Sequence, residues 1–183
     1  MNIASSEFTE LGSQMVLPLF EGVDKAPNNS LSGLSRSQRS LVRDALSSGS
    51  FDGKKGKRMT LWTPGCNIVL VGMGEKDSLG HKRARNTGAR LIASMSKKKG
   101  IDVTVRFTSG WSVERMIDFA EGMLLRDYEF LEHQESPKDH ISDPWNVSFQ
   151  ASSRYQESLS RGLSKVGSCL LYTSPSPRDL GKS

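Results

Sequence analysis

The stretch that decides the fold is Asn67-Ile68-Val69-Leu70-Val71, which is followed at once by Gly72-Met73-Gly74. Its apolar residues are continuous, and a strand without polar alternation is typically buried on both faces. We therefore predict a strand over residues 67–71 inside a sheet, with a layer of structure on each side. The two glycines predict a steep turn where this strand leaves the sheet.

Strand and helix patterns alternate on both sides of this stretch. Strands are predicted at residues 14–20, 58–62, 101–107 and 146–149. Helices are predicted at residues 37–47, 78–99, 112–132 and 155–166. Pro18 indicates either an edge strand or a strand end, and the alternation from Ile101 to Phe107 indicates a half-buried strand. The order predicts an α/β domain with a central mixed sheet flanked by helices.

Apolar residues at helical spacing predict the inward face of the three best-defined helices. For the first helix they are Leu41, Val42, Ala45 and Leu46. For the second they are Ala84, Gly88, Leu91, Ile92 and Met95, where Gly88 lets the helix approach the sheet. For the third they are Val113, Met116, Ile117, Ala120, Leu124, Tyr128 and Leu131. Gly122 is predicted on the outward face of the third helix.

Composition narrows the class of protein. The 183 residues suit one domain, and no stretch approaches the roughly 20 apolar residues that span a bilayer. The N-terminus has no secretory pattern, and two cysteines, Cys66 and Cys169, fit a reducing compartment, so a cytoplasmic location is expected. The segment 135–144 is polar and is expected to be a surface loop.

The net charge of +5 is concentrated in three basic clusters, at residues 54–58, 81–85 and 97–99. Clustered Lys and Arg can bind nucleic acid, but no aromatic residues for base stacking are interleaved with them. Solvated loops and helix ends are the favoured interpretation, and nucleic acid stays open as a weaker one.

Three parts of the sequence carry a family resemblance: the strand and exit 16–22, the glycine and basic motifs at 51–56, 67–74 and 82–89, and the Glu-Gly helix at 120–130. Together they resemble the N-terminal domain of the leucyl (cytosol) aminopeptidase family. The resemblance implies a macro-domain-like α/β fold over residues 1–168. It also implies a parent enzyme with a separate catalytic domain, which holds two divalent metals and cleaves the first peptide bond of a substrate. Zinc or manganese and a homo-hexamer are implied for that parent.

The resemblance ends near Ser168. Residues 169–183 resemble the conceptual translation of a sequencing adapter, and a Ser/Pro-rich disordered tail is the alternative. The expected domain is therefore truncated before its catalytic domain, and Cys66 is expected to be its only native thiol. The family's metal-site motif has no counterpart in these residues.

No catalytic, metal-binding or cofactor-binding residue is predicted. His81, His133 and His140 lack metal-ligand spacing and are expected on the surface, and neither a phosphate loop nor a complete dinucleotide fingerprint is present. The predicted function is an accessory domain, inactive alone, whose partner is its own missing catalytic domain. The alternative is a free-standing macro-domain-like nucleotide or nucleic-acid binding module that uses the exit after Val71 and the basic helix 78–99. No membrane association is expected.

Overall fold

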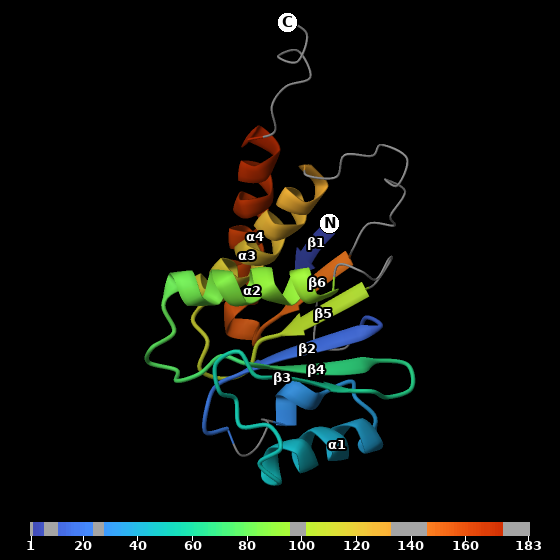
Figure 1. Ribbon diagram of the computed structural model, residues 1–183. Helices are drawn as coiled ribbons and strands as arrows, with labels where there is room; N and C mark the ends of the chain where they lie inside the picture. The colour runs from blue at the N-terminus through green and yellow to red at the C-terminus, as the bar shows by residue number, and fades with distance from the viewer. Residues whose placement is uncertain (1, 6–10, 24–27, 96–101, 133–145, 174–183) are drawn as a thin grey trace, which may run out of the picture.

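The computed structural model describes residues 2–5, 11–23, 28–95, 102–132 and 146–173 (Figure 1). The strands are β1 (Asn2–Ser5), β2 (Gln14–Leu19), β3 (Arg58–Leu61), β4 (Asn67–Gly72), β5 (Asp102–Arg106) and β6 (Asn146–Gln150). The helices are the 3-10 turn η1 (Asn28–Leu31), α1 (Arg36–Ser47), α2 (His81–Met95), α3 (Val113–Glu132) and α4 (Ser153–Thr173). The six strands of the described residues form one sheet in the order β1-β6-β5-β2-β4-β3.

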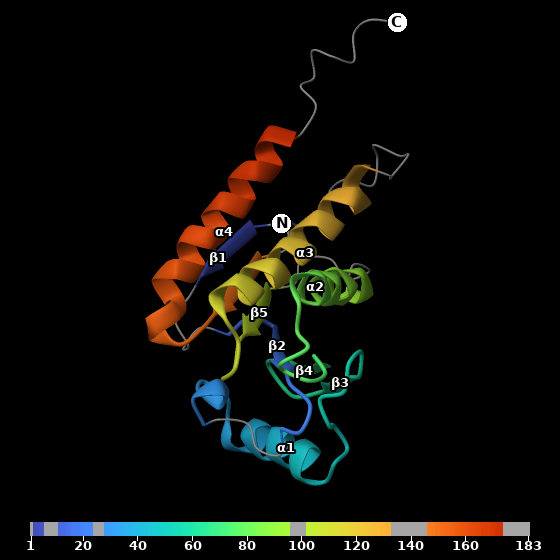
Figure 2. The ribbon, with the colours of Figure 1, turned by 90° about the vertical axis from the view of Figure 1, so that its left-hand side faces the viewer.

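The sheet is mixed, because β3 pairs antiparallel with β4 while the other neighbouring pairs are parallel. Helix α1 covers one face, and α2, α3 and α4 lie on the other (Figures 1 and 2). The side chains of β4 divide between the two layers: Ile68 and Leu70 pack in the core under α1, whereas Val69 and Val71 pack in the core under α2 and α3. The predicted α/β class and the doubly covered central strand are confirmed.

Pro18 lies in a central strand, so its interpretation as a sign of an edge strand is wrong. The alternative, a strand end, is right: β2 pairs with β5 only as far as Val16, while its pairing with β4 continues to Leu19. Proline has no N–H to donate, and none is needed toward β5, because β5 no longer pairs with β2 at this position. The Pro18 carbonyl instead accepts a hydrogen bond from Trp111 Nε1 at 3.3 Å.

Strand β5 is buried on both faces beyond Asp102, so the half-buried strand predicted from its alternation is wrong. Its polar side chains are enclosed because each has a partner. Thr104 Oγ1 accepts from the Gly12 N–H at 2.8 Å. The Arg106 guanidinium is fully buried and donates to Gln150 Oε1 at 2.7 Å and to the Ser32 carbonyl at 2.6 Å. Burial lowers the pKa of Arg106 to about 10, because the charged form loses water.

Helix α1 begins at a capping box, in which the Ser35 hydroxyl accepts from the Gln38 N–H and the Gln38 side chain accepts from the Ser35 N–H. The predicted burial of Val42, Ala45 and Leu46 is confirmed, but Leu41 is 43% exposed. The fourth buried position is Gln38, whose amide donates to Thr63 Oγ1 at 2.9 Å. A polar side chain therefore takes the place that the hydrophobic pattern gave to Leu41.

Helices α2 and α3 cross at two glycines. A Cβ built on Gly122 would lie 1.9 Å from the Arg85 carbonyl oxygen, and one on Gly88 would lie 2.0 Å from the Phe119 carbonyl oxygen. Gly122 therefore faces α2, and its predicted outward position is wrong. Gly88 faces inward as predicted, but it lets α2 approach another helix rather than the sheet.

The predicted inward residues of α2 agree with the observed burial, whereas those of α3 agree only in part. The five inward residues predicted for α2 are all buried. On α3, Met116 and Ala120 are buried, whereas Val113, Ile117 and Leu124 are only partly buried. Phe119 and Met123, which the pattern did not select, are fully buried. Phe119 and Met123 lie on the face of α3 that meets α2 at Gly88.

Several predicted segments differ in extent from the structure. Strand β1 was not predicted, and α4 begins two residues earlier and ends later than expected, so it includes residues 169–173 of the predicted tail. The side chains of Tyr128 and Leu131, the loop 135–144 and the last residues of the helix 78–99 lie outside the described residues. None of the described helices is long and apolar enough to cross a membrane.

Candidate functional site

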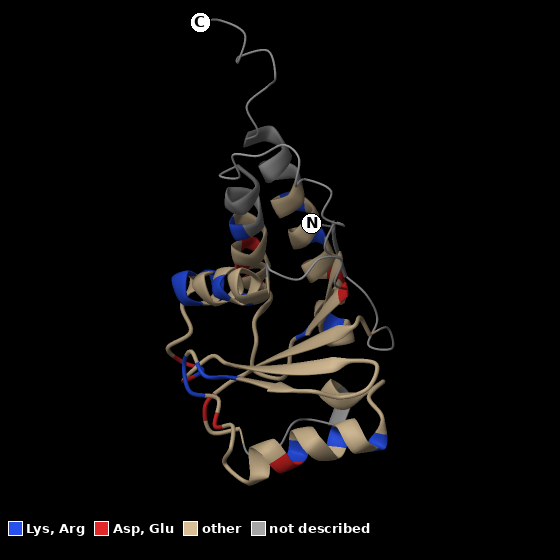
Figure 3. Ribbon diagram, turned by 45° about the vertical axis from the view of Figure 1, so that its right-hand side comes forward, with Lys and Arg blue, Asp and Glu red and all other residues tan. Residues whose placement is uncertain are grey.

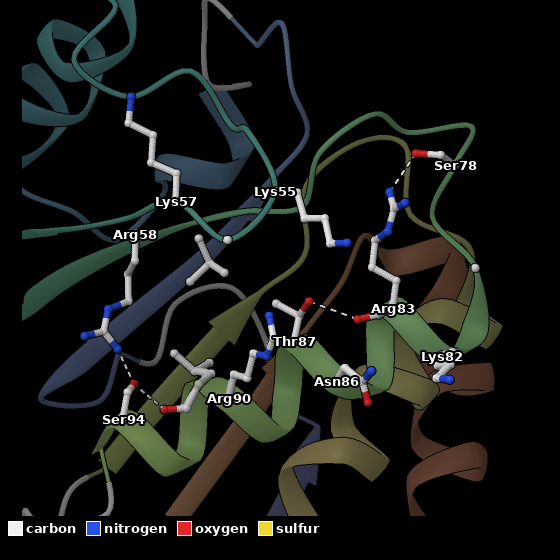
Figure 4. A pocket seen from close by; sticks show the side chains of 14 residues that line it. Lys55, Lys57, Arg58, Ser78, Lys82, Arg83, Asn86, Thr87, Arg90 and Ser94 are labelled. Carbon is white, nitrogen blue, oxygen red and sulfur yellow. Dashed lines mark hydrogen bonds between the residues drawn. The ribbon is translucent and has the colours of Figure 1, made fainter.

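A cleft of about 710 Å³ lies between the loop that precedes β3 and helix α2 (Figure 4). Six cationic side chains are among its described lining: Lys55, Lys57, Arg58, Lys82, Arg83 and Arg90. Ser78, Asn86, Thr87 and Ser94 add polar groups, and no Asp or Glu is among the lining residues that the structure describes. Figure 3 shows Lys and Arg on the loop and on α2 gathered at the same side of the molecule. We call this feature the basic cleft.

The loop side of the basic cleft is held by main-chain hydrogen bonds to the exit of β4. The Gly74 N–H donates to the Gly53 carbonyl at 2.9 Å, and the Gly56 N–H donates to the Gly72 carbonyl at 3.1 Å. The Gly72 N–H in turn donates to the Lys57 carbonyl at 2.8 Å. Because these bonds join backbone to backbone, they fix the position of Lys55 without using its side chain.

The glycines after β4 have different roles. Gly74 has a φ of +75°, a conformation that favours glycine, so it makes the predicted steep turn. Gly72 is still within β4, where a Cβ would lie 2.0 Å from the Lys54 carbonyl oxygen. Its predicted role in the turn is therefore wrong, and its lack of a side chain lets the basic loop lie against the strand.

Lys55 and Arg83 come from opposite sides of the basic cleft and meet beside Gly74. A Cβ built on Gly74 would lie 3.1 Å from Lys55 Cβ and 3.6 Å from Arg83 Nη1. Arg83 Nη1 donates to Ser78 Oγ at 2.6 Å, which orients the guanidinium. Figure 4 shows Lys55, Arg83 and Arg90 directed into the space between the loop and α2.

Little negative charge neutralises these cations. Lys57 forms an ion pair with Asp52 at 3.3 Å, and it extends away from α2 in Figure 4. The pKa of Asp52 lies below its usual value. The main cause is a hydrogen bond from the Lys54 N–H, and the Lys57 side chain lowers the pKa further. Arg58 donates to the hydroxyl of Ser94, a neutral partner. Within the described part of the chain, Lys57 is the only one of the six cations that forms an ion pair.

The first turn of α2 strengthens this imbalance. His81, Lys82 and Arg83 occupy it, and it contains no acidic residue. Helix N-termini favour negative charge, so cations at this end oppose the helix dipole. An anion bound in the basic cleft would relieve both this opposition and the repulsion among the cations.

A second hollow, of about 520 Å³, lies across the outer side of α2 and α3 and shares Asn86 and Arg90 with the basic cleft. Its Arg85 is paired with Glu121 at 2.6 Å. The local carboxylate reduces the positive charge there, so this hollow is the weaker anion site.

His81 and Asp118 form a close pair that could suggest acid–base chemistry. His81 Nδ1 lies 2.6 Å from Asp118 Oδ2, and Arg115 Nη1 lies 3.4 Å from the same oxygen. No hydroxyl or thiol of the described residues bonds to His81, so the pair lacks a nucleophile. Its role is to join α2 to α3. The His81 side chain is 65% exposed, which confirms its predicted surface position, while His133 and His140 lie outside the described residues.

Cys66 is buried, and desolvation raises the pKa of its thiol, which disfavours the reactive thiolate. Among the described residues, no group of three or more His, Cys, Asp or Glu side chains is arranged to hold a metal ion.

Sequence reasoning located the parts of the basic cleft but not their convergence. Val71, at the strand exit named in the alternative function, and the basic helix named with it both line the cleft. The basic clusters 54–58 and 81–85, interpreted as separate solvated ends, face each other across it. The cluster 97–99 lies outside the described residues. The sequence signal that could have located the site is the presence of glycines at 53, 56, 72 and 74. In the structure these glycines are hydrogen-bonded in pairs, which places the basic loop at the strand exit.

Comparisons with known proteins give a family and a fold. The family model described as "Cytosol aminopeptidase family, N-terminal domain" matches residues 16–137. A solved tomato leucine aminopeptidase mutant superposes with a TM-score of 0.64 at 21% identity, covering 91% of this chain and 35% of that chain.

Two structures of the bottromycin maturation enzyme BotP, one in complex with Mn, superpose with TM-scores of 0.49 and 0.48. Their identities are 12% and 13%; they cover 85% and 84% of this chain, which spans 30% and 29% of theirs. No curated protein matches this sequence.

Proposed function

Because this chain belongs to the cytosol aminopeptidase family through its N-terminal domain, we propose that it is the accessory domain of a two-metal leucyl aminopeptidase. The parent enzyme would release N-terminal amino acids from peptides. The observation that carries the proposal is the family match over residues 16–137. The chain spans 35% of the length of the tomato leucine aminopeptidase, and we therefore assign the proposed activity to a longer parent protein.

The chain alone is proposed to be inactive. The described residues do not fit a two-metal centre, because they contain no cluster of metal-ligating side chains. No step of metal chemistry is therefore assigned to this chain. In the parent, zinc or manganese would be held by the catalytic domain, where it would activate water and polarise the substrate carbonyl.

The arrangement of the parent is also part of the proposal. Residues 1–168 would form the accessory domain, with the catalytic domain as its direct partner and a homo-hexamer as the assembly. Residues 169–183 would be a non-native or disordered tail, although α4 continues to Thr173. A cytoplasmic location is supported by the low cysteine content.

Two experiments test this proposal. The purified chain is incubated with Mn²⁺ or Zn²⁺ and leucine p-nitroanilide, beside a complete leucine aminopeptidase as the positive control. No release of p-nitroaniline is expected, and metal-dependent turnover by the pure chain would refute the accessory role. Genomic sequence downstream of codon 168 is expected to encode a metal-binding catalytic domain.

A second candidate function, binding of a nucleotide or nucleic acid, is favoured by the basic cleft. Its cations are concentrated in a concave site and lack neutralising carboxylates among the described lining residues. Calorimetric titration with ADP-ribose and with duplex DNA, at low and moderate salt, tests this candidate. Binding of either ligand supports it, and the absence of heat with both would contradict it.

A further inference from the structure

We propose that the basic cleft binds a compact polyphosphate group, meaning two or more linked phosphates on a small molecule. This inference rests on the second candidate function above and names the ligand class for it. It is independent of whether the parent enzyme cleaves peptides.

The first reason is the convergence of charge from two directions. Lys55 approaches from the loop and Arg83 from α2. Lys55 Cβ and Arg83 Nη1 both lie beside Gly74, and Figure 4 shows the Lys55 side chain directed into the space between the loop and α2. Arg90 stands two helical turns further along the same side of α2, and Figure 4 shows it directed into the same space. A chain of phosphates presents charged oxygens in several directions, so it can meet such cations together, whereas a single phosphate reaches fewer of them.

The second reason is that the loop backbone at Lys55 and the side chains of Arg58 and Arg83 are positioned before a ligand arrives. Main-chain hydrogen bonds clamp the loop that carries Lys55, and Ser78 orients Arg83. Arg58 donates to the Ser94 hydroxyl, and Arg83 donates to the Ser78 hydroxyl. Both hydroxyls are neutral, so these hydrogen bonds orient the guanidinium groups without cancelling their positive charge. Preorganised donors bind an anion with less loss of conformational freedom.

The third reason favours a compact ligand over a nucleic acid strand. The described lining contains no aromatic side chain on which a base could stack. The volume of about 710 Å³ lies in the range of small-molecule sites. Beyond Arg90, the surface continues to Arg85, which is already paired with Glu121. Arg85 is therefore less available to an anion than the cleft cations Lys55, Arg83 and Arg90.

The test is calorimetric titration of the full 183-residue chain with inorganic tripolyphosphate, in a phosphate-free buffer of low ionic strength. The double variant Lys55→Gln with Arg90→Gln removes two cations from the cleft. The matched double variant Lys54→Gln with Arg85→Gln removes two neighbouring cations that do not line it. Both variants change the net charge equally, so long-range electrostatic effects cancel in the comparison.

We expect tripolyphosphate affinity to fall at least about tenfold in the cleft variant and less than about threefold in the matched variant. Orthophosphate is expected to bind at least about tenfold more weakly than tripolyphosphate. Circular dichroism and thermal unfolding establish that both variants are folded, as expected for exposed side chains.

Three results would overturn the proposal. They are absence of tripolyphosphate binding, equal losses in the two variants, and equal affinity for orthophosphate and tripolyphosphate. A parallel titration with a single-stranded oligonucleotide separates this proposal from the broader binding role. Oligonucleotide binding that depends on Lys55 and Arg90, without tripolyphosphate binding, would refute the compact ligand and keep the broader role. No binding of any of these ligands, together with the negative ADP-ribose and duplex DNA titrations, would refute both.

Discussion

Replacing Gly122 with Ala should destabilise the protein, although alanine is the better helix former. The new methyl carbon would lie 1.9 Å from the Arg85 carbonyl oxygen and 2.6 Å from its carbonyl carbon. Both are main-chain atoms of α2, so no side-chain rotation relieves the contact. The two helices must move apart, which loosens the packing of Phe119 and Met123 between them.

The magnitude follows from two opposing terms. Overpacking costs about 1–3 kcal/mol, and the upper end applies because backbone atoms must shift. Better helix propensity returns about 1 kcal/mol. We therefore expect the free energy of unfolding to fall by about 2 kcal/mol, which corresponds to a Tm lower by about 4–8 °C for a chain of this size.

The measurement is urea and thermal unfolding followed by circular dichroism. Gly167→Ala is the matched control, because Gly167 also lies in a helix and a Cβ there would have no neighbour within 4 Å. That control should gain up to about 1 kcal/mol. Gly88→Ala should behave like Gly122→Ala, since its Cβ would lie 2.0 Å from the Phe119 carbonyl oxygen. A Tm that rises in Gly122→Ala as in Gly167→Ala would refute the close helix contact.

Three further outcomes are expected. Arg106→Met should lower the free energy of unfolding by about 1–3 kcal/mol in urea titrations, because it removes the charged hydrogen bonds to the Gln150 side chain and the Ser32 carbonyl. Leu41→Lys should change stability by less than about 0.5 kcal/mol, whereas Val42→Lys should prevent stable folding, since Leu41 is 43% exposed and Val42 is fully buried. In a Cys169→Ser background, Cys66 should react with a thiol reagent only on unfolding. Burial raises the pKa of this thiol. Its contribution to stability is therefore complete below the unfolded-state pKa and is lost as the pH rises through the higher folded-state pKa. Rapid labelling of the folded protein at pH 8 would contradict this.

The sequence predicted the layers of the fold well, because apolar patterns report burial directly. The continuous run in β4 and the stripe on α2 both lie where they were expected. The sequence did not predict burial at positions where the buried residue is polar or is a glycine. Gln38 and Arg106 are enclosed by hydrogen bonds to distant residues, and no local pattern reveals such partners. Gly122 gives no apolar signal, and its contact depends on how two helices cross.

The candidate site illustrates the same limit. Its cations were visible as two clusters, but clusters separated along the chain reveal neither their distance nor their direction. The crossover from β4 to α2 brings them face to face, and the antiparallel return of β3 places the loop at the strand exit. The cations line one cleft because of the tertiary arrangement of the loop and α2, which the composition does not reveal.

The backbone clamp on the loop before β3 has one more consequence. Since the hydrogen bonds that join the loop to β4 use only peptide groups, the side chains at positions 54, 55 and 57 can be exchanged without removing these bonds. Acidic, neutral or aromatic side chains could be displayed from the same frame. The choice of ligand is therefore separable from the ability to fold, and few substitutions would suffice to redirect this surface to another molecule.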